Sequence, residues 1–290
     1  MAQLRTSRHL VDHKQRACGT SADYLKVQLR DYWQASPCGE IYGQGEELQE
    51  RLERHRLERY RLEPYIFDFA KFEEGAGRDV LEIGVGMGAD HLEWARNRPR
   101  SLTGVDLTPA AIAYTRSRLS QQGLTSDLRV GDAEALPFPD ASFDIVYSWG
   151  VLHHSPDTPK AISEALRVLR PGGIARVMIY HTYSITGYML WFRYALMQGR
   201  PFRSLTDIYS EHLESPGTKA YTKVEAAEMF RGVRSAAINV ILGSGDLLEG
   251  SAGQRHQGAL LTIAKRIWPR KLIRTFLPGH GLFLTIEAVK

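Results

Sequence analysis

The stretch VLEIGVGMG, from Val80 to Gly88, is the most informative part of this sequence. Its apolar run is short and ends at a glycine, which is typical of a buried strand in a parallel sheet. Glycines occupy positions 84, 86 and 88, just before a stretch, 89–98, that is predicted to be helical. Because glycine lacks a Cβ atom, the turn can be tight and can leave bare backbone against a ligand. The amino end of the helix adds N–H donors and partial positive charge, so the stretch predicts a binding turn between strand and helix.

Strand and helix patterns alternate from about residue 78 to residue 180. Short apolar runs predict strands at 79–84, 101–107, 127–130, 143–148 and 173–180, with helices at 89–98, 109–122 and 159–169 between them. The sequence Arg170-Pro171-Gly172-Gly173 is expected to stop the last of these helices and turn the chain. Two further strands are predicted at 235–242 and 282–289. This alternation predicts an α/β fold with a parallel sheet and helices on both faces.

Acidic residues follow the first three predicted strands or lie at their ends. Asp106 ends the second strand, where a carboxylate can accept two hydrogen bonds from a ribose diol. Asp132 follows the third strand, and Glu82 lies two residues before the first glycine. The G-x-G-x-G spacing and a carboxylate beside the turn disfavour a pyrophosphate, so a nicotinamide oxidoreductase is the weaker alternative. The same carboxylate suits a cation or an amine.

With these motifs the sequence resembles the class I S-adenosylmethionine-dependent methyltransferases, in particular the small-molecule group with quinone- and sterol-type enzymes. The resemblance covers about 76–180 and rests on four motifs: VLEIGVGMG, VDLT at 105–108, GDAEALPFPDASFDIVYSWGVLHH at 131–154, and LRPGG at 169–173. It implies a three-layer, Rossmann-like, seven-stranded sheet whose last strand is antiparallel and lies between strands five and six. It also implies S-adenosyl-L-methionine as cofactor, S-adenosyl-L-homocysteine as product, and no required metal.

The resemblance also implies roles for individual residues. Glu82 and the three glycines would wrap the methionine part of the cofactor, and Asp106 would bind both ribose hydroxyls. The residues that follow strands two and three, at 107–108 and 132–133, would contact adenine. The residues at the end of strand four, 148–150, would contact both cofactor and substrate. The implied cofactor residues are Glu82, Gly84, Gly86, Gly88, Asp106, Leu107, Thr108, Asp132, Ala133, Ser148, Trp149 and Gly150.

Three histidines are candidate general bases, because they follow the carboxyl ends of strands four and five, where open α/β sheets bind ligands. His153 and His154 follow the fourth strand, and His181 follows the fifth. Each can accept a proton near neutral pH. The alternative is that these rings only cap or shape the pocket, and a base is needed only if the methyl acceptor must lose a proton.

The chain is expected to have three parts: a flexible tail at 1–20, a helical lid at 21–75 and a methyltransferase domain at 76–290 with inserts at 182–233 and 243–281. In the lid, Tyr24, Tyr32 and Trp33 would lie over the cofactor, where aromatic faces attract a sulfonium. Simple hydrophobic anchoring on the sheet is the alternative. Tyr180 and Tyr183 are expected on the substrate side.

Three further stretches each allow two interpretations. The helix predicted at 46–65 is dense in Glu and Arg, and it forms either a solvated face or a grip for an acidic partner. The aromatic stretch 183–194 forms either a wall of the acceptor pocket or a core or dimer-interface helix. The basic amphipathic stretch 260–276 either packs on the domain or touches an anionic membrane surface or lipid-like substrate.

Composition narrows the function classes. The 290 residues include 37 Lys and Arg against 33 Asp and Glu, for a net charge of +4, and only two cysteines. The cysteines exclude a disulfide scaffold and suit a cytoplasmic protein, and the amino-terminal sequence is not a secretory signal. We expect methyl transfer to an O, N or C atom of a partly apolar small molecule, with no nucleic-acid partner. The sequence leaves a monomer and a homodimer both open. The alternatives are a lipid or quinone methyltransferase at a membrane surface, and a noncatalytic cofactor-binding scaffold.

Overall fold

The computed structural model describes residues 21–37, 39–40, 47–249 and 265–290. The tail predicted at 1–20, both cysteines and the first part of the basic stretch, 260–264, lie outside the described residues. None of the described helices is long and apolar enough to cross a membrane.

A seven-stranded sheet forms the centre of the molecule, in the order β3-β2-β1-β4-β5-β7-β6. β7 is antiparallel to both of its neighbours, β5 and β6, whereas the remaining pairs are parallel. The predicted fold class, with an antiparallel last strand between strands five and six, is therefore confirmed. The strands are β1 (Asp79–Ile83), β2 (Ser101–Asp106), β3 (Asp127–Val130), β4 (Phe143–Trp149), β5 (Leu169–Tyr180), β6 (Ser235–Ile241) and β7 (Phe283–Val289).

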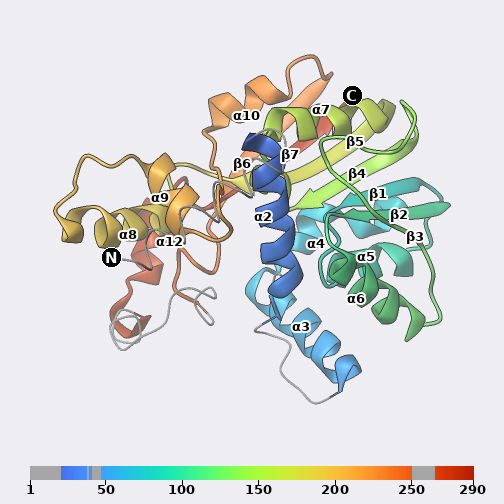
Figure 1. Cartoon of the computed structure of the whole chain (residues 1–290), viewed down its shortest axis with the longest axis horizontal. Coiled ribbons are helices and arrows are strands. Elements are labelled where there is room, and N and C mark those ends of the chain that lie inside the picture. The colour runs from blue at the N-terminus through green and yellow to red at the C-terminus, as the bar shows by residue number, and fades with distance from the viewer. Residues whose placement is uncertain (1–20, 38, 41–46, 250–264) are drawn as a thin grey trace, which may run out of the picture.

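Helices cover both faces of this sheet (Figure 1). Thr108 begins one of them with a side chain that accepts from the N–H of Ala111, and Pro109 then occupies a first-turn position, where no N–H is needed. The helices are α2 (Ser21–Ala35), α3 (Leu48–Leu62), α4 (Tyr65–Ala70), η2 (Phe72–Gly75), α5 (Ala89–Arg96), α6 (Pro109–Ser120), η3 (Leu152–His154), α7 (Thr158–Val168), α8 (Ile185–Tyr194), η4 (Leu196–Gln198), α9 (Leu205–His212), α10 (Lys223–Met229) and α12 (Arg270–Phe276).

The sequence after α7 differs from its prediction. The helix ends at Val168 as expected, but Arg170–Gly173 does not turn the chain out of the sheet, because β5 begins at Leu169. Instead the register with β4 shifts, so that Phe143 faces Leu169 while Ile145 faces Ile174. Gly172, at φ 79°, supplies the left-handed conformation within this irregularity.

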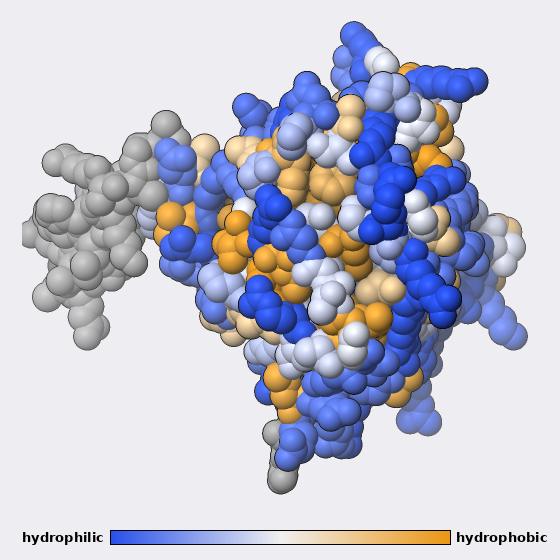
Figure 2. All heavy atoms as spheres, turned by 90° about the vertical axis from the view of Figure 1, so that its right-hand side faces the viewer, coloured by the Kyte–Doolittle hydropathy of each residue, from blue (hydrophilic) through white to orange (hydrophobic). Residues whose placement is uncertain are grey.

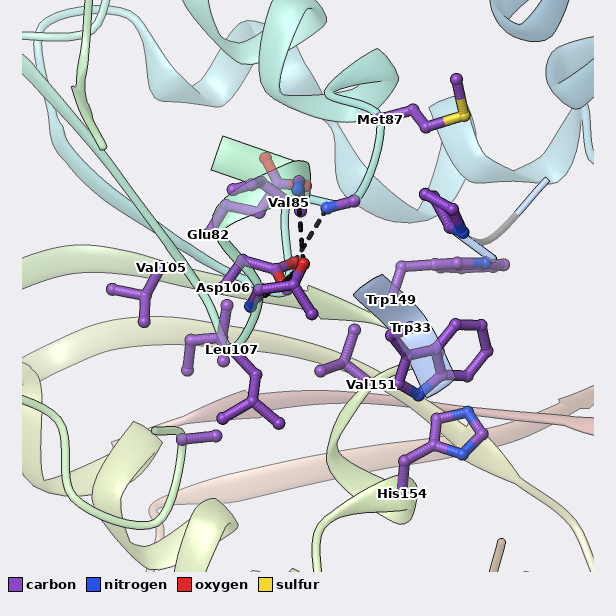
Figure 3. Close-up of a pocket in the computed structure, with 18 of the residues that line it drawn as sticks. Trp33, Glu82, Val85, Met87, Val105, Asp106, Leu107, Trp149, Val151 and His154 are labelled. Carbon is purple, nitrogen blue, oxygen red and sulfur yellow. Dashed lines mark hydrogen bonds between the residues drawn. The ribbon is translucent and has the colours of Figure 1, made fainter. Parts of the chain in front are cut away.

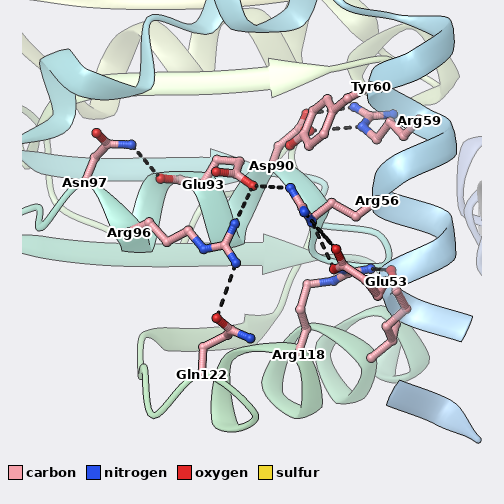
Figure 4. Close-up of polar contacts among 11 residues, drawn as sticks. Glu53, Arg56, Arg59, Tyr60, Asp90, Glu93, Arg96, Asn97, Arg118 and Gln122 are labelled. Atoms are coloured by element: carbon pink, nitrogen blue, oxygen red, sulfur yellow. Dashed lines mark hydrogen bonds and ion pairs between the residues drawn. The ribbon is translucent and has the colours of Figure 1, made fainter. Parts of the chain in front are cut away.

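Charged contacts fasten α3 to α5 (Figure 4). Arg59 on α3 makes a two-pronged contact with Asp90 on α5, with N–O distances of 2.9 and 2.7 Å. Arg56 lies 3.2 Å from Glu93. Within α3, Arg54 pairs with Glu50 one turn away, whereas Arg51 lies 3.6 Å from Glu40. One side of this helix is therefore an internal contact surface, and its other side is exposed.

Helices α8 and α9, which follow β5, and α12, which precedes β7, form a helical lobe beside the sheet, seen in Figure 1 as the yellow and red helices on the left. Ile185 of α8 packs with Leu247 and with Ile273 of α12, which joins the two inserts. The basic stretch is not one helix in its described part, because Pro269 separates α12 from the residues before it. On the side of the molecule opposite the lobe, hydrophilic and hydrophobic side chains are intermixed (Figure 2).

Candidate active site

A cavity lies at the carboxyl ends of β1, β2 and β4, where open parallel sheets bind their ligands (Figure 3). The glycine turn after β1 forms one wall, and residues after β2 and β3 form another. Helix α2 crosses the opening and contributes Lys26, Leu29 and Trp33. The cavity is therefore bounded by the sheet on one side and by a separate amino-terminal helix on the other.

The three glycines of the turn have left-handed backbones but different surroundings. A Cβ atom on Gly84 would lie 2.2 Å from Val151, and one on Gly88 would lie 2.8 Å from the Thr115 backbone. A Cβ atom on Gly86 would meet nothing within 4 Å. Two glycines therefore permit close packing of the turn, and the third leaves bare backbone facing open space.

Asp106 holds the glycine turn and the next loop together. Its Oδ2 accepts from the N–H of Gly86 at 3.1 Å, and its Oδ1 accepts from the N–H and hydroxyl of Thr108, both at 2.9 Å. Burial raises the pKa of Asp106, although these hydrogen bonds oppose the rise. The carboxylate is fixed at the cavity wall, and its unused lone pairs can accept hydroxyl groups from a ligand.

Glu82 and His91 form a buried pair behind the turn. Oε2 of Glu82 lies 2.9 Å from Nδ1 of His91, whose Nε2 lies 2.7 Å from the Ser126 hydroxyl. Burial, reinforced by Asp90, raises the pKa of Glu82 well above its usual range, and burial lowers the pKa of His91 to about 3. The imidazole of His91 is therefore neutral near pH 7, and burial disfavours the charged form of Glu82. A cationic group brought to the Glu82 end of the cavity would favour ionisation of this carboxyl group.

Asp132 is paired with the helix that crosses the cavity. Lys26 Nζ lies 2.6 Å from Asp132 Oδ2 and 2.5 Å from Glu134 Oε2. Although burial opposes ionisation of both partners, these contacts raise the pKa of Lys26 and help to lower that of Glu134. The acid expected to meet adenine therefore already binds a cation from α2.

Arg59 and Asp90 form a largely buried ion pair, and both residues line the cavity. The hydroxyl groups of Tyr60 and Tyr147 also donate to Asp90, at 3.0 and 2.7 Å. Although burial opposes ionisation, Arg59 and these donors hold the pKa of Asp90 below its usual value. Sequence reasoning missed this network, because α3 and α5 are far apart in the chain and no local motif joins them.

Aromatic rings surround the other end of the cavity, where Trp33 and Trp149 line the wall beside His154 (Figure 3). The rings of Trp33 and His154 meet edge to face at 5.2 Å. Trp149 also forms a hydrogen bond with Glu63, whose pKa burial raises to about 7. This end of the cavity is thus largely apolar, with one imidazole at its edge.

His154 is held by residues from the lobe. Its Nδ1 lies 2.9 Å from the Ser215 hydroxyl and 3.2 Å from that of Thr218, and its Nε2 lies 3.5 Å from Glu214. Glu214 also accepts a hydrogen bond of 2.8 Å from the hydroxyl of Tyr180. Glu214 follows α9 and is far from His154 in the sequence. No local motif could therefore predict that the two side chains meet.

The other two candidate bases lie elsewhere. Burial lowers the pKa of His153 well below its usual range, and neither of its ring nitrogens has a hydrogen-bond partner among the described residues. His181 is buried, and its Nδ1 lies 3.2 Å from the carbonyl oxygen of Gly281. Neither ring is among the residues that line the cavity. Both are therefore badly placed to take a proton from a ligand there.

Most of the predicted cofactor residues do line the cavity. They are Glu82, Gly84, Gly86, Gly88, Asp106, Leu107, Thr108, Asp132, Ala133, Trp149 and Gly150. Ser148 is the exception, because it is fully buried and its hydroxyl donates to the carbonyl of Ile83. A strand alternates its side chains, so the residue before Trp149 faces the opposite side of the sheet.

Of the residues expected on the lid and substrate side, Trp33 lines the cavity. Tyr24, Tyr32, Tyr180 and Tyr183 are not among its lining residues, and Tyr183 is exposed on the lobe. The aromatic stretch 183–194 likewise contributes no residue to this cavity. Lys26, Leu29 and Val151 line it without having been predicted.

The sheet order and the cavity together define the class I methyltransferase fold. Residues 81–177 match the family described as "Methyltransferase domain". This part of the chain is therefore similar to methyltransferase domains, as its motifs predicted.

Comparison with individual proteins agrees with this class. The chain is 43% identical over 100 residues to the phthiotriol/phenolphthiotriol dimycocerosates methyltransferase of Mycobacterium leprae, covering 34% of this chain and 36% of that one. It is 37% identical over 98 residues to the 2-methyl-6-phytyl-1,4-hydroquinone methyltransferase of Synechocystis, covering 34% and 30%. These alignments span only about a third of each relative.

Among solved structures, an S-adenosylmethionine-dependent methyltransferase from Mesorhizobium loti superimposes with a TM-score of 0.51 at 17% identity, covering 75% of this chain and 93% of that one. At this identity the likeness concerns the fold.

Proposed function

We propose that this chain transfers a methyl group from S-adenosyl-L-methionine to an O, N or C atom of a partly apolar small molecule. The supporting observation is the cavity itself. Bare backbone at Gly86 and fixed carboxylates at Asp106 and Asp132 lie at one end, and an aromatic wall with His154 lies at the other. One end suits a nucleoside with a cationic amino-acid tail, and the other suits an apolar acceptor.

The residues fit the cofactor at each of its three parts. Gly86 leaves room for it against the turn, and an ammonium group beside Glu82 would favour the ionised form of that carboxyl group. Asp106 would accept from the ribose hydroxyls, and Asp132 would accept from the adenine amine. Leu107 and Ala133, which line the cavity between these acids, would contact the apolar faces of the base. The product S-adenosyl-L-homocysteine would bind to the same residues.

The bound cofactor supplies a methyl group that its positive sulfur already activates. The chain then has to hold the acceptor in line with that methyl group, and such positioning contributes on the order of 7–11 kcal/mol in favourable cases. The faces of Trp33 and Trp149 would attract the positive charge by about 0.5–2 kcal/mol and exclude water. We infer that α2 acts as a lid, with Lys26 fastening it to Asp132 and Glu134.

His154 and Glu214 form the best-placed proton acceptor. Thr218 donates its hydroxyl proton to the Ser215 carbonyl, at 2.7 Å, and its oxygen lies 3.2 Å from the Ser215 hydroxyl, which can donate to it. The Ser215 oxygen can then accept from Nδ1 of His154, which leaves the Nε2 lone pair, on the side of Glu214, to take a proton. A methyl acceptor that loses a proton would pass it to Nε2 as its bond to the methyl group forms and the sulfur–methyl bond breaks, and Glu214 would stabilise the resulting imidazolium.

The acceptor class is supported by the apolar wall and by the two relatives, one of which is named for a phytyl-bearing hydroquinone. A methyltransferase that works on lipids or quinones at a membrane surface is the second candidate, and the exposed surface of the lobe favours it. A noncatalytic scaffold that binds the cofactor would retain the same cavity, so only turnover separates it from an enzyme.

Calorimetric titration with S-adenosylmethionine, S-adenosylhomocysteine and NAD tests the cofactor. We expect binding of the first two and none of NAD, and the reverse result would contradict the proposal. Release of S-adenosylhomocysteine is then measured with hydroquinones and alcohols that carry alkyl chains. If no member of such a panel is methylated while the cofactor binds, the scaffold becomes the better explanation.

The dyad is tested with Glu214→Gln, using the exposed neighbour Glu211→Gln as matched control. For an acceptor that loses a proton, we expect kcat to fall and its pH profile to flatten at unchanged cofactor affinity. A profile that keeps its wild-type shape in Glu214→Gln would remove this residue from the reaction.

A further inference from the structure

The helical lobe exposes an unusual concentration of large hydrophobic side chains. Fifteen such side chains are exposed among the described residues, and ten of them lie in two segments, 183–203 and 265–277. Phe202 is 99% exposed and Phe276 is 73% exposed. Single exposed hydrophobic residues need no explanation, but a cluster of this kind marks an interaction surface.

The exposed residues follow the helical repeat. Tyr188 and Phe192 lie one turn apart on α8, and Leu196 continues the spacing into η4. Leu272 and Phe276 have the same spacing on α12. The opposite sides of the two helices pack on each other through a shared cluster, and Figure 1 shows them in the same lobe. Each helix thus has a buried apolar side and an exposed apolar side, which folding of this chain alone does not require.

Charge on these two segments has a single sign. They contain eight arginines and lysines and neither an aspartate nor a glutamate. Two of the eight are paired with acids from elsewhere: Arg203 lies 2.7 Å from Glu211, and Arg274 lies 2.8 Å from Glu249. Arg200, Arg266 and Lys271 are exposed among the apolar side chains. Exposed aromatic and aliphatic residues among basic ones are typical of surfaces that insert into an anionic lipid interface.

The lobe is also continuous with the aromatic end of the cavity. Leu190 of α8 and Leu213, just after α9, belong to the same buried cluster as Trp149 and Tyr180. Glu214, which faces His154, follows directly in the chain. The lobe therefore packs against the acceptor end of the cavity rather than against the cofactor end.

We propose that the exposed apolar and basic side chains of 183–203 and 265–277, here called the lobe face, dock the chain on a bilayer that contains anionic lipids. A second copy of the chain fits this surface less well, because it would bring two surfaces with the same excess of positive charge together. The proposal deepens the proposed function, and it rests on that function only for the claim that the apolar acceptor is taken from the bilayer.

Flotation of the full chain with vesicles tests the docking. The vesicles are an equimolar mixture of phosphatidylglycerol and phosphatidylcholine, or phosphatidylcholine alone, each at 0.1 and 0.5 M salt. We expect flotation with the anionic vesicles that weakens at the higher salt concentration, since exposed charges are screened. Equal partition to both vesicles, or none to either, overturns the proposal.

Two double variants locate the face. Phe202→Ser with Phe276→Ser removes exposed apolar groups, and Arg200→Glu with Lys271→Glu reverses charge. Each is expected to reduce vesicle binding about tenfold or more. The matched controls are Val224→Ser, 79% exposed on α10, and Arg234→Glu, also exposed, which should bind as wild type does. Equal losses in the controls contradict the assignment to this face.

Binding of S-adenosylhomocysteine in solution is measured on every variant. Retained affinity shows that a variant is folded, and it separates failure of the docking from failure of the proposed cofactor site. Sedimentation of the wild type and the serine variant without lipid completes the test. A stable dimer that the serine variant loses would assign the face to a second copy and overturn membrane docking.

Discussion

Lys26 of α2 lies 2.6 Å from Asp132, at the wall of the cavity formed by the sheet. This contact, with the 2.5 Å contact to Glu134, ties the amino-terminal helix to residues that follow β3. Because Lys26 and Asp132 also line the cavity, a ligand that enters it has to pass or share this ion pair. The position of α2 and the occupancy of the cavity are therefore coupled through one side chain.

Replacement of Lys26 by methionine should loosen α2 without removing its apolar contacts. Partly exposed ion pairs contribute little each, so we expect cofactor dissociation to be faster by about three- to tenfold. Stopped-flow measurement of the dissociation rate checks this. Lys71→Met, which removes a 2.9 Å pair with Glu287 away from the cavity, is the matched control. A dissociation rate that is unchanged, or changed equally by both variants, would leave Lys26 without a role in retention.

Asp106→Ala should weaken cofactor binding about ten- to a hundredfold, because charge-assisted hydrogen bonds contribute about 1.5–3 kcal/mol each. Asp106 also accepts from Gly86 and Thr108, so Asp106→Asn, which keeps its size, is compared to separate loop disorder from lost binding. The exposed carboxylate of Asp68 provides the control, Asp68→Ala. Calorimetry that finds wild-type affinity in both Asp106 variants would refute the ribose role.

The sheet and much of the cofactor end follow from local sequence. The alternation of strands and helices and the glycine turn predicted the order of the elements. Asp106 and Asp132 could be predicted to line the cavity because their positions depend only on where β2 and β3 end. The side chain of Ser148 does not line the cavity, because one position along a strand reverses the direction of the side chain. Arg170–Gly173 follows the predicted end of the helix but stays within β5, where the register with β4 shifts.

The acceptor end could not be predicted in the same way. The contact of His154 with Glu214 joins residues 60 positions apart, and its contact with Ser215 joins residues 61 positions apart. Such contacts depend on how the lobe packs against the sheet, and no periodicity records that packing. The sequence therefore gave three histidine candidates with His154 first, and burial and cavity lining separate it from the other two.

Glu63 should make the stability of the fold depend on pH. Burial raises its pKa to about 7 from the ordinary 4.5, with Arg59 opposing the rise. Between these values the folded chain retains a proton that the unfolded chain has released. The free energy of unfolding therefore falls as the pH rises from about 4.5 to about 7, by up to about 3 kcal/mol over the interval.

Glu63→Gln removes this ionisable group and with it the pH dependence. The free energy of unfolding of the variant, relative to that of the wild type, should therefore increase from pH 5 to pH 7.5. Urea unfolding at several pH values within this window measures the difference. The exposed Glu73→Gln serves as control and should run parallel to wild type. Parallel curves for wild type and Glu63→Gln would show that Glu63 is ionised in the fold from low pH.

Gly86→Ala should separate backbone strain from cofactor binding. Gly86 has φ 51°, and a Cβ atom there meets no atom of the chain within 4 Å, so the substitution costs about 1–2 kcal/mol of strain and leaves the fold intact. The added methyl group would project from the turn toward the cavity and obstruct the cofactor. Gly77→Ala is the matched control, because Gly77 has φ 68° and equally open surroundings but does not line the cavity. We expect similar losses in Tm for the two variants and a loss of cofactor affinity, about tenfold or more, in Gly86→Ala alone. Gly84→Ala should unfold the turn outright, since its Cβ atom would overlap Val151. If Gly86→Ala binds S-adenosylhomocysteine as Gly77→Ala does, the cofactor does not lie against this part of the turn.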